Sequence, residues 1–108
     1  MEETHVGEFA IFRSRDQGVV FGRLVSLVVA PGGLGVAIIE EARQIHGWDQ
    51  SIHTLFEAAN RGFGLARISE PLVKRLTMFG ICGVLPCTQE AIDNLRQSRW
   101  NALPQSSE

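Results

Sequence analysis

Two segments near the start of the chain alternate between two faces, as strands do. Residues 6–13 and 19–29 both show this period of two, with apolar side chains on each face. Between them, residues 14–18 read Ser-Arg-Asp-Gln-Gly, and Gly18 can adopt the positive φ that a hairpin turn requires. Gly22, inside the second segment, indicates a bulge or the close approach of another backbone. The pattern predicts an antiparallel hairpin.

The period then changes from that of a strand to that of a helix. Ala-Pro-Gly-Gly at 30–33 predicts a second turn, and a third strand follows over residues 36–45. The change of period takes place within residues 47–51. A helix is expected from about Gln50 to Asn60, because apolar residues recur there with helical spacing, at Ile52, Leu55, Phe56 and Ala59.

Candidate caps and two side chains suited to ligands flank this helix. Asp49 and Ser51 are both candidates for the N-cap, and Gly62 is suited to end the helix. A helix N-terminus attracts anions through its unpaired N–H groups, and Arg43 and Trp48 lie just upstream. Two interpretations of Trp48 stay open. It can pack on the first turn as a hydrophobic staple, which is the commoner arrangement, or form a platform for a nucleotide base.

The second half of the chain predicts further strands and a second helix. Residues 63–68 read as a short strand that ends before a proline. Residues 72–79 and 81–85 are extended and apolar, and Pro86 ends the sheet. Thr88 is the expected N-cap of a helix whose apolar residues pack inward. The last residues are polar and carry no predicted element.

Together these elements define an α+β domain with about five to six mostly antiparallel strands and two short helices. A single domain is expected over residues 1–108, with an ordered core from about 6 to 103. Two helices cannot cover both faces of such a sheet. Because apolar residues also alternate on the remaining face, we expect a second copy of the chain to cover it with two-fold symmetry.

Composition and charge argue against several classes of protein. Hydrophobic residues make up 44% of the chain and its net charge is −2, whereas general nucleic-acid binders carry a basic excess. No run of 18 apolar residues is present and the start is acidic and polar, so neither a membrane span nor a signal peptide is expected. Cys82 and Cys87 have no second pair, which disfavours a zinc site and fits reduced thiols in the cytoplasm. No metal or cofactor is expected.

No side chains have the spacing of an enzyme active site. His46 and His53 flank the change from strand to helix, but neither has a carboxylate placed to orient it. Glu40 and Glu41 are neighbours in a strand, so they point to opposite faces. Cys87 would have a lowered pKa if exposed at the helix N-terminus, although burial is commoner. We therefore expect a non-catalytic protein, with a nucleotide hydrolase that uses His46 or His53 as base as an alternative.

Several short motifs follow one another in a recognisable order. They are Arg-Ser-Arg-Asp-Gln-Gly-Val-Val-Phe-Gly at 13–22, Ala-Arg-Gln-Ile-His-Gly-Trp at 42–48, Ser51-Ile52, Leu-Pro-Cys-Thr-Gln-Glu-Ala at 85–91, and Trp100. In this order the chain resembles a family of small phage and prophage proteins, that of the phage anti-Thoeris sponge. The resemblance implies a protein that binds and sequesters cyclic nucleotide immune signals without chemistry. The implied signals are cyclic ADP-ribose isomers and the cyclic oligonucleotides of a related immune system.

The resemblance also implies a homodimer that associates further into a hexamer, with pockets between protomers in the host-cell cytoplasm. Nine of the ten basic residues are arginine, which suits phosphate binding but also follows from GC-rich codon usage. The expected ligand-binding residues are Arg13, Arg15, Arg43, Trp48, Ser51, Arg67 and Arg75. Arg13 and Arg15 lie at the first hairpin. Arg43, Trp48 and Ser51 precede or begin the first helix, and Arg67 and Arg75 could belong to either group. A phage structural or protein-inhibitory oligomer is the alternative to nucleotide binding.

Overall fold

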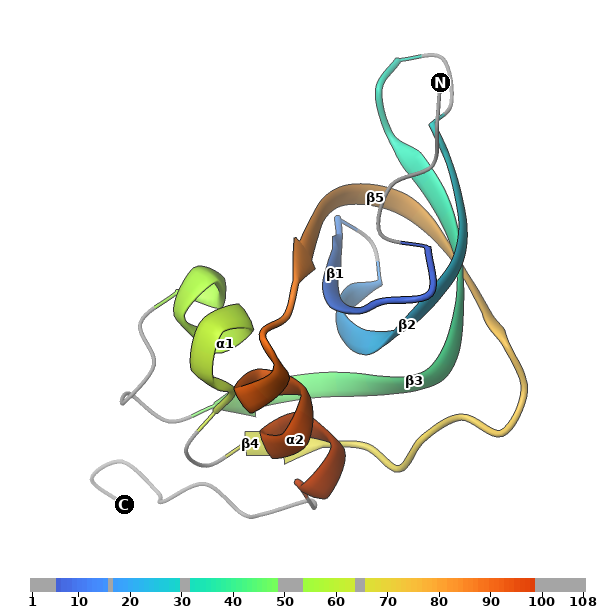
Figure 1. Ribbon diagram of the computed structural model, residues 1–108. Coiled ribbons are helices and arrows are strands. Elements are labelled where there is room, and N and C mark those ends of the chain that lie inside the picture. The colour runs from blue at the N-terminus through green and yellow to red at the C-terminus, as the bar shows by residue number, and fades with distance from the viewer. Residues whose placement is uncertain (1–5, 16, 30–31, 49–53, 64–65, 99–108) are drawn as a thin grey trace, which may run out of the picture.

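A computed structural model describes residues 6–15, 17–29, 32–48, 54–63 and 66–98 (Figure 1). Within these ranges the elements are β1 (Phe9–Ser14), β2 (Gly18–Val29), β3 (Gly35–Trp48), α1 (Leu55–Arg61), β4 (Ala66–Ile68), β5 (Leu76–Pro86) and α2 (Gln89–Gln97). All the strand pairings are antiparallel. The predicted α+β fold is confirmed. None of the described helices is long and apolar enough to cross a membrane.

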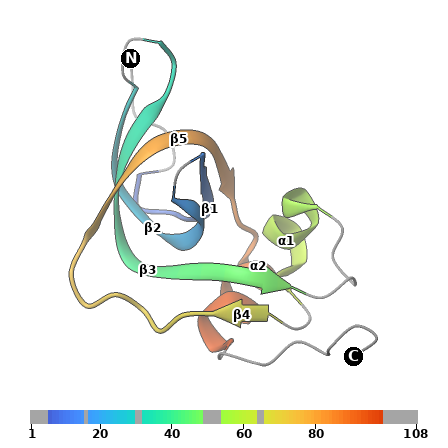
Figure 2. The same cartoon turned by 180° about the vertical axis from the view of Figure 1, so that it is seen from behind.

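The sheet closes on itself. Its strand order is β2-β1-β5-β3-β4, and β2 also pairs with β3, so β1, β2, β3 and β5 form a small barrel. β4 extends the sheet beyond this ring by pairing with the end of β3. Figures 1 and 2 show β5 arching over one side of the ring and β3 crossing the other, with both helices beside it.

Barrel closure gives the molecule two cores. The interior core contains Ala10, Phe12, Val20, Leu24, Ala37, Ile39, Ala42, Met78 and Ile81. The outer core, between the barrel wall and the helices, contains Ile11, Phe21, Ile45, Ala58, Ala59, Phe63, Ala66, Ile68 and Leu95. The prediction that one apolar face stays uncovered is wrong, because the sheet curls and buries that face against itself. This face of the sheet therefore gives no reason to expect a second copy of the chain.

A bulge lies opposite Gly22, in β3 and not in β2 itself. The registers on either side of it are Phe21↔Arg43 and Arg23↔Glu40, so β3 contributes one residue more than β2. Within this bulge Glu41 has a φ of 53°, a left-handed conformation that few residues other than glycine adopt. A Cβ atom on Gly22 would lie 2.4 Å from Cγ2 of Ile39 and 2.9 Å from the carbonyl oxygen of Glu40. Close backbone approach therefore requires glycine here.

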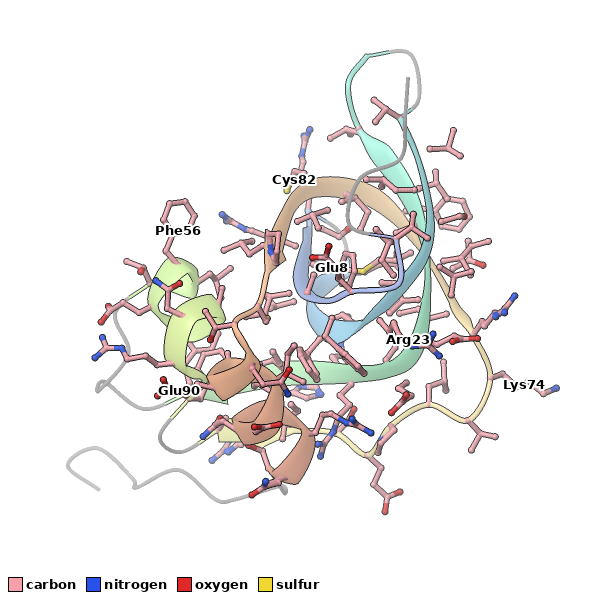
Figure 3. All side chains as sticks on the ribbon, viewed as in Figure 1. Glu8, Arg23, Phe56, Lys74, Cys82 and Glu90 are labelled. Atoms are coloured by element: carbon pink, nitrogen blue, oxygen red, sulfur yellow. The ribbon has the colours of Figure 1, made fainter. Side chains whose placement is uncertain are left out.

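The first helix begins later than the sequence predicted. Its N-cap is Thr54, whose Oγ1 accepts a hydrogen bond from the Glu57 N–H, and it ends at Gly62 with a φ of 83°. The predicted caps Asp49 and Ser51 lie outside the described residues. Phe56 was expected to pack inward, but its side chain points away from the body of the molecule and is 74% exposed (Figure 3).

The last strand also begins later than expected. Residues 69–75, of which 72–75 were predicted to be extended, instead form a strap that leads from β4 to β5 (Figure 2). The predicted cap of α2 is confirmed, because Oγ1 of Thr88 accepts a hydrogen bond from the Ala91 N–H. The same hydroxyl donates to the carbonyl oxygen of Asn60 at 2.6 Å, which joins the start of α2 to α1.

Candidate binding site at the mouth of the barrel

A hollow of about 830 Å³ lies between the barrel and the strap. We call it the mouth hollow; it is lined by Gln17, Val20, Ala42, Gln44, Ser69, Glu70, Pro71, Leu72, Val73, Lys74 and Leu76. Val20 and Ala42 also belong to the interior core, so the hollow borders the inside of the barrel. Its volume lies within the range of small-molecule sites, which often occupy the mouths of β-barrels.

Hydrogen bonds to the main chain of β3 hold one end of the strap in place. The N–H of Ser69 donates to the carbonyl oxygen of Gln44, and the N–H of Gln44 donates to Oγ of Ser69, both at 2.8 Å. The N–H of Leu72 donates to the carbonyl oxygen of Ala42, also at 2.8 Å. At the other end, Leu76 pairs with Ile39 in the sheet. The outer wall of the hollow is therefore fixed at both ends.

A carboxylate between two guanidinium groups stabilises the far end of the strap. Glu40 accepts a hydrogen bond from Arg23 through Oε1 and one from Arg75 at 3.0 Å through Oε2. The side chain of Arg75 is 61% exposed, so its share of this network contributes little to the free energy of folding. In this conformation Arg75, one of the predicted ligand-binding residues, is paired with Glu40.

Gln17, in the turn between β1 and β2, also lines the hollow. Oε1 of Gln17 accepts a hydrogen bond from the Phe79 N–H, and Oγ of Ser14 donates to the Phe79 carbonyl oxygen, both at 2.7 Å. These bonds dock the turn onto β5. Arg13 and Arg15, the predicted pair at this hairpin, are both exposed. Both guanidinium groups are therefore accessible to solvent.

The lining combines an apolar floor with a few polar groups. Gln17, Gln44 and Ser69 bring uncharged donors and acceptors, while Glu70 and Lys74 bring opposite charges. Such a surface can bury the apolar part of a small ligand and orient its polar groups. None of the predicted residues that the structure describes lines the hollow.

Arg43 has a structural position. It is 5% exposed, and its guanidinium donates to the carbonyl oxygens of Ser69 at 2.8 Å, Leu95 at 2.7 Å, Arg96 at 3.1 Å and Ser98 at 2.5 Å. Three of these carbonyls lie at the C-terminal end of α2, where a cation interacts favourably with the helix dipole. The side chain therefore ties β3 to the strap and to α2, and these bonds compete with any ligand.

The other predicted residues do not join Arg43 in one pocket. Trp48 stacks on Phe63, with ring centroids 5.0 Å apart, and packs against the outer core, so it is a packing residue, although this partner follows α1 and does not belong to its first turn. Arg67 is half-buried on β4, and its Nε is buried without a hydrogen-bond partner. Ser51 lies outside the described residues. The predicted group of Arg43, Trp48 and Ser51 thus has two members committed to packing.

The titratable groups that the structure describes include one with a large shift. Burial raises the pKa of the Cys87 thiol from 9.0 to about 12, and a hydrogen bond with the Ile11 backbone opposes this effect. The thiol is therefore protonated at neutral pH, as expected for a packed cysteine. His46 is exposed, whereas His5 and His53 lie outside the described residues. Among the described side chains, no three potential metal ligands gather together.

The residues of the mouth hollow were not identified from the sequence. Gln44, Ser69 and Lys74 are separated in the chain and carry no motif, so only the folding of the strap against β3 brings them together. The one local signal was the break expected near Pro71, which does mark the start of the strap.

Comparison with protein families matches residues 7–95 to the family described as a domain of unknown function, DUF6948. This region covers the whole barrel, both walls of the mouth hollow and most of α2, and the chain belongs to this family. Searches of curated proteins and of solved structures found no match.

Proposed function

We propose that this chain is a non-catalytic phage anti-defence protein. It binds cyclic nucleotide immune signals, namely cyclic ADP-ribose isomers or cyclic oligonucleotides, and sequesters them in the host-cell cytoplasm as a homo-oligomer. The order of sequence motifs supports the class of ligand. The observation that carries the proposal is the mouth hollow, which has the volume of a small-molecule site.

Basic side chains around the hollow suit a phosphorylated ligand. Lys74 lines it directly together with the oppositely charged Glu70, and Arg15 is exposed two residues before Gln17, which also lines it. A hydrogen bond between a phosphate and a charged side chain contributes about 1.5–3 kcal/mol. The apolar floor adds burial of the ribose or base, and the uncharged amides orient it.

Thermal unfolding with a panel of cyclic ADP-ribose isomers and cyclic di- and trinucleotides tests the proposal. A ligand that binds the folded state raises the Tm with the logarithm of its concentration. Heating the complex should then release the ligand intact. A cleaved product would indicate the hydrolase alternative, and a panel without any Tm shift would contradict nucleotide binding.

The double variant Arg15→Ala, Lys74→Ala should weaken binding of the best ligand by about ten- to a hundredfold, because it removes charge-assisted contacts. Isothermal titration calorimetry measures this change. Arg61→Ala is the matched control, since Arg61 is also exposed but pairs with Glu57 on α1. Equal affinity in the double variant and the control would place the ligand elsewhere.

Exposed apolar side chains favour a second candidate, an oligomeric structural or protein-inhibitory module. Val73 on the strap is 99% exposed and Phe79 on β5 is 59% exposed. Single apolar residues on a surface are common, but a partner chain is one reason to keep them there. Light scattering distinguishes the cases: a monomer would contradict the oligomeric part of both candidates. Val73→Asp should dissociate an oligomer whose interface contains the strap.

A further inference from the structure

The strap presents a short apolar segment to solvent. Its middle residues Pro71, Leu72 and Val73 are all exposed, Leu72 at 47% and Val73 at 99%. The N–H of Leu72 is bonded to β3 on the inner side, so the strap holds this segment at the surface. Three consecutive exposed apolar residues are uncommon in a folded chain unless they serve a contact.

Two opposite charges flank this apolar segment. Glu70 precedes it and Lys74 follows it, so the strap reads Glu-Pro-Leu-Val-Lys. Both side chains are exposed, and Figure 3 shows Lys74 extending from the strap into solvent. Among the described residues neither forms an ion pair, whereas the neighbouring Arg75 is paired with Glu40. Both charges are therefore available to a partner.

This order of charges is complementary to itself. A two-fold contact brings residue i of one copy to residue j of the other, and residue j to residue i. With the axis near Leu72, Glu70 faces the partner's Lys74, and Lys74 faces the partner's Glu70, while the apolar residues meet between them. A partner surface of one sign of charge would match only one end of the strap. The charges therefore favour a second copy of the chain as the partner.

We propose that two copies of this chain associate through their straps, aligned antiparallel about a two-fold axis near Leu72. The inference names an interface for the homo-oligomer of the proposed function and rests on that part of it, and it does not require a bound nucleotide. A contact limited to the strap is small, so it belongs to the weak class of interfaces whose formation depends on protein concentration. The same residues line the mouth hollow, so the partner's strap lies at its rim.

Analytical ultracentrifugation over a range of protein concentrations, without nucleotide, tests this contact. The wild type should dimerise reversibly. Glu70→Lys brings like positive charges together at both ends of the contact, and Lys74→Glu does the same with carboxylates. Each variant alone should therefore raise the Kd of the dimer by about tenfold or more. Because both side chains are exposed and outside any ion pair of the chain, the Tm should stay close to that of the wild type.

Mixing the two single variants distinguishes charge pairing from simple damage to the strap. In the mixed dimer a lysine faces a carboxylate at both ends, so a heterodimer with about the wild-type Kd should form. The double variant Glu70→Lys, Lys74→Glu exchanges the two charges and should associate with itself as the wild type does. Glu90→Lys is the matched control, because it changes the net charge as Glu70→Lys does but lies on α2, at the opposite side of the molecule from Lys74 (Figure 3). It should dimerise normally.

Four results would overturn the strap contact. They are a wild type that stays monomeric at about 1 mM, a Glu70→Lys variant that dimerises unchanged, single variants that remain monomeric when mixed, and equal weakening by Glu90→Lys. The first result alone would also contradict the oligomeric part of the proposed function. Nucleotide binding has a separate readout in the Tm panel, so the two proposals can fail independently.

Discussion

At the scale of single residues, Arg43 illustrates how a charged side chain can be a structural element. Replacing it with alanine removes a hydrogen-bond donor from four carbonyl groups in a largely buried part of the molecule. Arg43→Ala should therefore lower the free energy of unfolding by about 3 kcal/mol or more. Urea denaturation measures the change. Arg61→Ala, which breaks an exposed pair, should cost no more than about 0.5 kcal/mol. If Arg43→Ala is as stable as the wild type but no longer binds the ligand, Arg43 is a ligand-binding residue and not a structural one.

Gly22 permits a second test at this scale. In Gly22→Ala the new Cβ meets a side chain at 2.4 Å and a backbone oxygen at 2.9 Å, so β2 and the bulge must move apart. The cost should be about 1–3 kcal/mol by urea denaturation. Gly83→Ala is the matched control in β5, because the nearest atom there is 3.8 Å from the new Cβ. Equal stability of the two variants would contradict the close approach.

At the scale of elements, Thr88 joins the two helices. Its hydroxyl caps α2 and donates to the last turn of α1, so one side chain serves both. Thr88→Ala should cost about 1–2 kcal/mol of unfolding free energy, whereas Thr88→Ser keeps the hydroxyl and should cost much less. Thermal unfolding of both variants checks this. A serine variant as unstable as the alanine variant would assign the effect to the lost methyl group instead.

At the scale of the whole molecule, barrel closure should appear in amide exchange. β1 is paired on both sides, by β2 and β5, so its amides exchange only when the ring opens and should be among the slowest. The tip of the strap at Val73 should exchange at least about a hundredfold faster, while the Leu72 amide, bonded to β3, should be intermediate. Hydrogen–deuterium exchange by NMR measures these rates. Rapid exchange in β1 would contradict a closed barrel.

Local patterns predicted the local structure well. The hairpin at Gly18, the length of β2 and the cap at Thr88 follow from steric preference and capping within a few residues. Errors arose where apolar spacing along the chain did not decide which side chains pack. Phe56 matched the helical spacing but faces solvent, because a helix that begins at Leu55 packs through Ala58 and Ala59 instead.

The sequence by itself indicated which segments are strands, their alternation, the two helices and a special backbone position at Gly22. Tertiary structure alone decided that the sheet closes into a barrel, because this requires β2 to pair with β3 while β1 pairs with the distant β5. It also decided that Arg43 serves the end of α2 and that the strap encloses a hollow. The partners of a side chain and the walls of a cavity come from residues far apart in the chain, and no local pattern records them.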